Sequence, residues 1–203
     1  MSREPAKQGK LLPLRRVDGV TEEMSDEALI AACAVGERAA LGALFDRHAD
    51  AVYRFVSRAT TTSASDADDL VQATFMQVWR SADRFGGKSS ARSWILGIAA
   101  NLIRHHARGE ARRRAALDNL AHVPEHRSNR PDDEVARREL VGRLGDALAK
   151  LPHDLRVAFV MCDLEQVAGV DAARALRVRP GTMWRRLHQA RRKLRAALEG
   201  GTR

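Results

Sequence analysis

An apolar stripe runs through the most basic stretch of the chain and limits the structures that this stretch can adopt. In residues 178–194, VRPGTMWRRLHQARRKL, the apolar positions Met183, Leu187, Ala190 and Leu194 lie four, three and four residues apart. This spacing places them on one face of a helix and leaves the other faces to charge. The charges are all positive, and like charges three or four residues apart repel. Such a helix predicts an anionic partner.

A short helical segment and a tight turn precede this basic helix. Two helices joined by such a turn, with the second one basic, form the helix-turn-helix pattern, whose second helix enters the major groove of DNA. A solvated basic helix end is the alternative, but no acid occurs from Arg174 to Arg195. Trp184 either touches a thymine methyl or a sugar, or lies half-packed beside Met183. The pattern favours nucleic-acid binding.

Composition narrows the class of partner. The formal charge of +9 and a pI near 10.6 indicate a polyanion, with nucleic acid first and an acidic membrane surface or acidic protein next. The two cysteines, Cys33 and Cys162, are far apart, and His105 and His106 point away from each other on a helix. We therefore expect no disulfide, metal or other cofactor. No signal core or apolar run of about 20 residues occurs, so the expected location is the cytoplasm.

Helical periodicity extends through the rest of the chain. It runs through residues 25–116 and resumes at 134, while residues 117–133 lose it and contain two prolines. The predicted fold is all-α, with two small helical domains joined by a flexible linker and a helix-turn-helix in the second. The predicted parts are a flexible arm at 1–24, a domain at 25–116, the linker at 117–133 and a domain at 134–203.

Local signals define several helix boundaries. Ser25 or Asp26 is the expected N-cap of the first helix, and Gly36 divides the segment that follows into two helices. Acidic residues begin a helix over 66–85, where the macrodipole favours them. The next helix is expected from Trp94, and one unbroken helix is expected over 152–165. Trp79 and Trp94 fall on apolar stripes, so core packing is favoured over a role as stacking platforms for bases.

These segments resemble the extracytoplasmic-function (ECF) sigma factors of bacterial RNA polymerase, minimal two-domain members of the sigma-70 family. DADDLVQATFMQVWRSADRF is similar to region 2.2, and ARSWILGIAANLIRHHAR is similar to regions 2.3 and 2.4. LPHDLRVAFVMCDLE and RPGTMWRRLHQARRKL resemble regions 4.1 and 4.2. The order and spacing of these motifs make the resemblance specific from about Ser25 to Leu198.

The resemblance implies a sigma factor, not a catalyst, that binds core RNA polymerase and directs promoter-specific initiation. An anti-sigma factor is the implied regulator. The polymerase contacts are the clamp helices of the largest subunit and the flap. On the chain, the implied clamp-binding residues are Asp69, Leu70, Val71 and Gln72, with Gln77 and Arg80 nearby.

The resemblance also divides the DNA contacts between two elements of the promoter. The loop and helix implied to hold the opened minus-ten strand supply Lys88, Ser89, Ser90, Arg92, Asn101, His105 and Arg108. For the minus-35 duplex, the implied base-edge residues are Trp184, Arg185, His188 and Gln189, and the implied phosphate contacts are Thr182, Arg186 and Arg191.

The sequence departs from the family pattern in four places, one of which is a pair of residues. Arg177 stands where the turn usually has glycine, and it would be strained if that turn needs a left-handed residue. Val170 and Asp171 replace an acidic pair, Trp184 replaces a basic or small polar residue, and Gly97 replaces a basic residue. These departures leave the promoter sequence open.

Two other functions stay open at this point. A stand-alone helix-turn-helix regulator would use the C-terminal domain, but it would not need the acidic helix start at 66–69 or the basic helix end at 104–114. An enzyme is disfavoured because no nucleophile triad, phosphate-binding glycine loop or metal-ligand spacing occurs. The arm at 1–24 is longer than the family needs and is either inert or regulatory.

Overall fold

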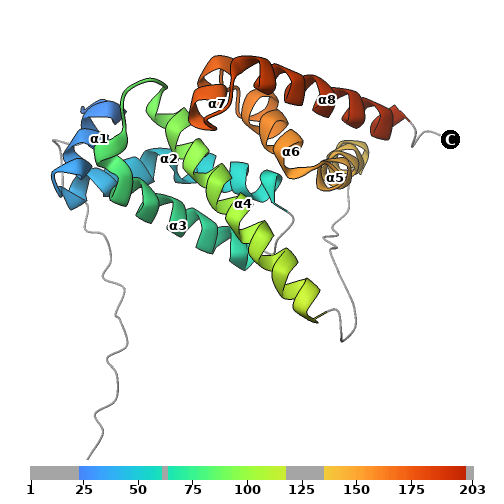
Figure 1. The fold of residues 1–203 in the computed structure, drawn as a ribbon, viewed down its shortest axis with the longest axis horizontal. Helices are drawn as coiled ribbons and strands as arrows, with labels where there is room; N and C mark the ends of the chain where they lie inside the picture. Colours follow the sequence, from blue (N-terminus) through green and yellow to red (C-terminus); the bar gives the residue numbers. More distant parts are fainter. Residues whose placement is uncertain (1–22, 61–63, 118–134, 200–203) are drawn as a thin grey trace, which may run out of the picture.

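The protein is built from helices that form two lobes. A computed structural model describes residues 23–60, 64–117 and 135–199, and every regular element in these ranges is helical. The predicted linker, apart from residue 117, and nearly all of the N-terminal arm lie outside the described residues. The all-α class is confirmed. Helices α1–α4 make the first lobe and α5–α8 make the second (Figure 1).

The first lobe begins with two helices whose boundaries follow the sequence signals. In α1 (Asp26–Ala34), the hydroxyl of the N-cap Ser25 accepts a hydrogen bond from the backbone amide of Ala28 at 3.2 Å. Gly36 has a φ of 94°, a left-handed conformation that glycine adopts without strain, and it separates α1 from α2 (Arg38–Ala59) as predicted.

Two further helices complete this lobe and position the loop between them. Helix α3 (Ala64–Ser81) ends in a 3₁₀ turn, η1 (Ala82–Arg84), so the helix predicted to reach Phe85 tightens in its last residues. Helix α4 (Ala91–Leu117) begins before the expected Trp94. The reason is that the Ser90 hydroxyl accepts a hydrogen bond from the Ser93 amide at 3.2 Å, which satisfies an otherwise unpaired donor of the first turn.

The second lobe contains the predicted helix-turn-helix. Helix α5 (Val135–Ala149) leads to α6 (His153–Phe159) and then to a π-helical turn, η2 (Val160–Leu164). The expectation of one unbroken helix over 152–165 was therefore wrong, because the backbone widens after Phe159. The Glu165 amide bonds to the Val160 carbonyl at 2.8 Å, which is the wider spacing of a π turn.

The last two helices, α7 (Gly169–Ala175) and α8 (Pro180–Glu199), carry the apolar stripe from which the fold was predicted. Met183, Leu187, Ala190 and Leu194 are all buried, as expected. Their burial fixes the orientation of α8 about its own axis. Most of the cationic side chains of α8 are thereby exposed, and Arg186 alone among those from 185 to 195 is half-buried.

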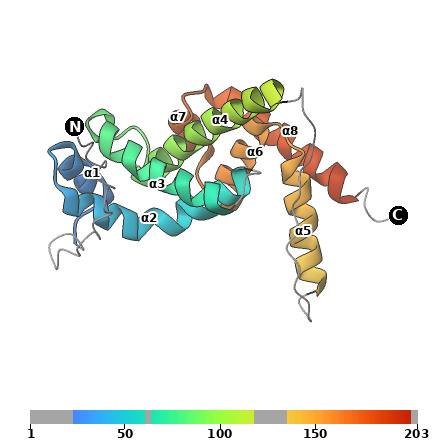
Figure 2. The same ribbon diagram turned by 90° about the horizontal axis from the view of Figure 1, so that it is seen from below.

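The two lobes pack directly on each other. Helix α7 lies against α4, while α6 and η2 lie against α2 (Figures 1 and 2). Helix α5 projects away from the first lobe in the second view. Among the described residues, no helix is both long enough and apolar enough to cross a membrane.

Candidate nucleic-acid interface

The outer face of α8 presents most of the residues expected to contact minus-35 DNA. Trp184, Arg185 and His188 are exposed, and Thr182 and Gln189 are half-buried. These side chains lie on the faces that the buried stripe leaves to solvent. The geometry gives α8 a polar and cationic surface of the width that a major groove accepts.

Two arginines of α8 already have anionic partners within their own lobe. Arg186 bonds to Asp154 at the start of α6, and Arg191 donates from Nε to the Asp163 carboxylate at 2.9 Å. No acid lies near these cations along the chain, so the sequence indicated an external anion as their partner. The fold supplies acids from 28 and 32 residues away.

Trp184 is half-packed, but its neighbour is a glycine at the start of α7. A Cβ atom on Gly169 would lie only 2.6 Å from Cη2 of the indole ring, so a larger residue there would displace the ring. The rest of the side chain faces solvent, and Trp184 is 51% exposed. Both sequence hypotheses for Trp184, partial packing and contact with DNA, stay compatible with this position.

The turn between α7 and α8 contains a left-handed residue at the position where the family usually has glycine. Arg177 has a φ of 54°, in the left-handed region that disfavours side chains other than glycine. Gln166, in the connection before α7, has a φ of 55°. Sequence reasoning missed Gln166, since nothing in its local sequence marks a left-handed position.

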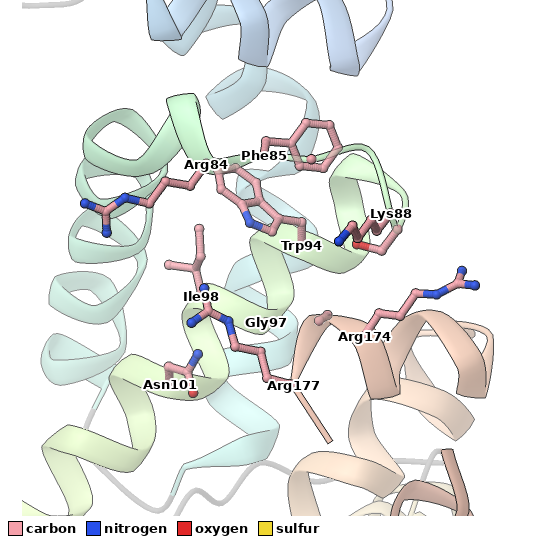
Figure 3. A pocket seen from close by; sticks show the side chains of 12 residues that line it. Arg84, Phe85, Lys88, Trp94, Gly97, Ile98, Asn101, Arg174 and Arg177 are labelled. Atoms are coloured by element: carbon pink, nitrogen blue, oxygen red, sulfur yellow. The ribbon is translucent and has the colours of Figure 1, made fainter. Parts of the chain in front are cut away.

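The loop before α4 and the first half of α4 border a cavity of about 660 Å³. Lys88, Ser89 and Asn101, three of the expected minus-ten residues, line it together with Arg174 and Arg177 of the second lobe (Figure 3). Phe85 and Trp94 form an aromatic wall, with ring centroids 5.1 Å apart. Trp94 also packs against the core, which is the role that the sequence favoured for it. Cations and aromatic rings in one concave site suit a single nucleic-acid strand.

The remaining expected minus-ten residues divide between the loop and the far part of α4. Ser90 is exposed and bonds to Ser93. His105 and Arg108 are exposed further along the helix. Arg92 differs from these, because its guanidinium bonds to Glu165 of the second lobe at 2.7 Å. For the basic residues 112–114, only the backbone is described.

The expected polymerase-binding residues separate by burial. Asp69 and Gln72 are exposed on α3, whereas Leu70 and Val71 are 7% and 8% exposed and belong to the hydrophobic core. Met76, one turn beyond Gln72, is 45% exposed, and sequence reasoning did not include it. Residues four apart lie on the same face of a helix, so the spacing between Gln72 and Met76 could have indicated Met76 from the sequence.

Burial shifts the pKa of one histidine and of both cysteines. Desolvation, reinforced chiefly by the Arg104 charge, lowers the pKa of His153 to about 4, so its ring is neutral at neutral pH. Burial raises the pKa of both Cys33 and Cys162 to about 11, which keeps them as unreactive thiols.

Comparison with known proteins matches both lobes. Sigma-70 region 2 matches residues 44–113, and Sigma-70 region 4 matches residues 142–194. The chain is 28% identical over 180 residues to the ECF RNA polymerase sigma-E factor of Haemophilus influenzae, covering 85% of the chain and 94% of that relative. It is 32% identical over 177 residues to the ECF RNA polymerase sigma factor SigM of Mycobacterium tuberculosis, covering 87% of the chain and 86% of SigM.

A solved structure agrees with these likenesses. CnrH, in complex with the cytosolic domain of CnrY, matches with a TM-score of 0.61 and 26% identity over 86% of this chain and 97% of CnrH. The match therefore extends over both helical lobes. The chain belongs to the family of ECF RNA polymerase sigma factors.

Proposed function

We propose that this sigma factor binds core RNA polymerase through the exposed face of α3 and contacts promoter DNA through two separate surfaces. The outer face of α8 contacts the minus-35 duplex. The loop at 86–90 and the adjoining part of α4 hold the opened minus-ten strand. The observation that carries this proposal is the pairing of a duplex-sized basic helix with a concave, cationic and aromatic site on the other lobe.

Each proposed role is assigned to one part of the chain. Residues 25–116 would form the polymerase-binding and minus-ten domain, 117–133 the linker, and 134–203 the minus-35 domain. A stand-alone regulator would have no use for a first lobe that matches Sigma-70 region 2. The proposed action needs no catalytic chemistry by the chain itself and takes place in the cytoplasm, with the polymerase.

We also propose control by an anti-sigma factor. The similar protein CnrH has been solved in complex with another protein domain. In this chain, both lobes present charged surfaces to which a partner of opposite charge could bind. Such a partner would compete with polymerase or DNA for those surfaces.

The experiment that tests the polymerase contact compares single substitutions on α3. Purified protein is mixed with sigma-free core RNA polymerase, and complex formation is measured by size exclusion. Gln72→Ala and Asp69→Ala should weaken the complex, because both residues are exposed where the contact is proposed. Glu27→Ala, which removes an exposed acid from α1, serves as the matched control and should bind like the unmodified protein.

One outcome would overturn the sigma mechanism. If the protein fails to bind core polymerase at low salt but binds duplex DNA tightly by itself, the stand-alone regulator becomes the better explanation. Equal weakening by Glu27→Ala would instead place the contact elsewhere on the lobe.

A further inference from the structure

The junction between the two lobes is built around one buried carboxylate. Glu165, just after η2, has a side chain that is only 2% exposed. Its carboxylate accepts hydrogen bonds from Arg58 of α2 at 3.0 Å and from Arg92 of α4 at 2.7 Å. Arg92 also donates to the Glu165 carbonyl at 2.6 Å. Because a buried carboxylate needs charged partners to offset its lost hydration, the two arginines of the first lobe stabilise Glu165 at the junction.

A second contact fits the lobes together by shape. A Cβ atom on Gly97 would lie 2.7 Å from the carbonyl oxygen of Ala175, and the three nearest atoms around it all belong to Ala175. Glycine in a helix interior is unfavourable, so its presence in α4 calls for a reason. The reason here is the close approach of α7. A basic residue at position 97, the pattern from which this chain departs, would not fit against α7.

A third contact bridges the lobes at the other end of the junction. The Asp154 carboxylate accepts from Arg104 of α4 at 3.3 Å and also bonds to Arg186 of α8. Asp154 therefore occupies one arginine from each lobe. Arg186 is one of the expected phosphate contacts.

The closed arrangement covers residues that DNA would need. Arg92 is engaged by an acid, and the second lobe forms one wall of the cavity that Lys88 and Asn101 line. Arg177 reaches across α4 toward Ile98 and Asn101 (Figure 3). A strand entering this cavity would meet α7 and the turn that follows it.

We propose that the contact between the lobes is an autoinhibitory latch, in which Glu165 takes the place of DNA at Arg92 and α7 covers the strand-binding face of α4. The protein then captures a single strand only after the lobes separate. This inference rests on the proposed function for the role of Arg92 and Asn101. It does not depend on any second protein.

The first test replaces the buried acid and matches the change in charge. Glu165→Gln removes the ionic contact, and the control Asp146→Asn removes one negative charge from an exposed position of α5. The readouts are the radius of gyration from small-angle X-ray scattering and the affinity for a mixed-sequence 20-nucleotide single strand at low salt.

The latch predicts that Glu165→Gln expands the molecule and tightens strand binding, whereas Asp146→Asn does neither. If the closed form makes up about 90% of the unmodified protein, release raises the apparent affinity about tenfold. An equal gain for both variants would mean that net charge, not the latch, controls strand binding. That result would overturn the proposal.

The second test opens the lobes without changing a charge. Gly97→Ser places a side chain against the Ala175 carbonyl and should produce the same expansion and the same gain in strand affinity. If circular dichroism shows that Glu165→Gln does not fold, Gly97→Ser replaces it as the variant that tests the latch. A scattering profile of the unmodified protein that is already as extended as that of Gly97→Ser would refute the latch.

Binding to core polymerase separates this inference from the proposed function. If the unmodified protein binds polymerase but neither variant changes lobe separation or strand affinity, the latch is wrong and the sigma mechanism stands. If no version binds polymerase, the proposed function fails, and the scattering comparison still decides whether the lobes are latched.

Discussion

The two candidate DNA surfaces differ in how accessible their residues are. Trp184, Arg185 and His188 are exposed on α8, although the lobes are closed. On α4, Arg92 is held by Glu165, and Asn101 faces a cavity that the other lobe partly walls off. The proposed roles therefore predict that α8 binds duplex DNA while the lobes are closed, whereas the site on α4 binds a strand only after they separate. Four predictions test these two surfaces and the contacts that support them.

The largest effect should come from the support beneath α8. Met183 is fully buried, so Met183→Ala should lower the free energy of unfolding by about 3 kcal/mol through lost burial and the cavity left behind. Urea denaturation measures this change. Arg192→Ala, at an exposed position of the same helix, should stay within about 0.5 kcal/mol of the unmodified protein. A small loss for Met183→Ala would mean that α8 is held by its ion pairs instead of its apolar stripe.

The second prediction distinguishes a contact between Arg185 and a base from a general effect of its positive charge. Arg185→Ala should weaken binding to a duplex promoter fragment, selected with the holoenzyme, by about 2 kcal/mol, because a bidentate arginine–guanine contact is lost. Binding to single-stranded DNA should not change. Arg195→Ala removes an equal charge from an exposed position near the end of α8 and is the control. Equal losses for the two variants would show that Arg185 acts only through charge.

A smaller effect should appear with pH at the junction of the lobes. Because the pKa of His153 is lowered to about 4 from 6.5, the unfolded chain takes up a proton that the folded chain refuses between these values. Stability should therefore be full above pH 6.5 and fall as the pH is lowered toward 4. At pH 5 the loss should be about 1 kcal/mol, after allowing for the part of the ring that solvent reaches.

Thermal unfolding at pH 7.5 and pH 5 measures this dependence, and His153→Gln should remove it. The charged groups around His153 are Arg104, Asp154, Arg156 and Arg186. A pH dependence that persists unchanged in His153→Gln would assign the proton to another group.

The smallest effect should come from the turn that faces the cavity. Arg177→Gly should raise the free energy of unfolding by about 0.5 kcal/mol, because relief of the left-handed strain exceeds the entropy that glycine adds to the unfolded chain. Arg174→Gly, three residues earlier and helical, should instead lower it by about 1 kcal/mol. Denaturant midpoints of the two variants should move in opposite directions. A loss of stability with Arg177→Gly would indicate that the Arg177 side chain contributes more than its backbone costs.

Much of the fold followed from local patterns. The stripe from Met183 to Leu194 predicted both α8 and its buried face, and Gly36 predicted the break between α1 and α2. The boundaries that failed were set by a cap at Ser90, a tightened turn at Ala82–Arg84 and a widened turn at Val160–Leu164. All three depend on hydrogen bonds that residue periodicity does not encode.

The helical class, the helix-turn-helix and the family were predictable from the sequence, because helix periodicity and motif order depend on residues near one another in the chain. Which arginines are paired with acids follows from the packing of the helices instead. Arg92 meets Glu165 across 73 residues, and Gly97 meets Ala175 on the other lobe. Such pairings arise when the packing of two apolar cores places distant surfaces together, and no local pattern records them.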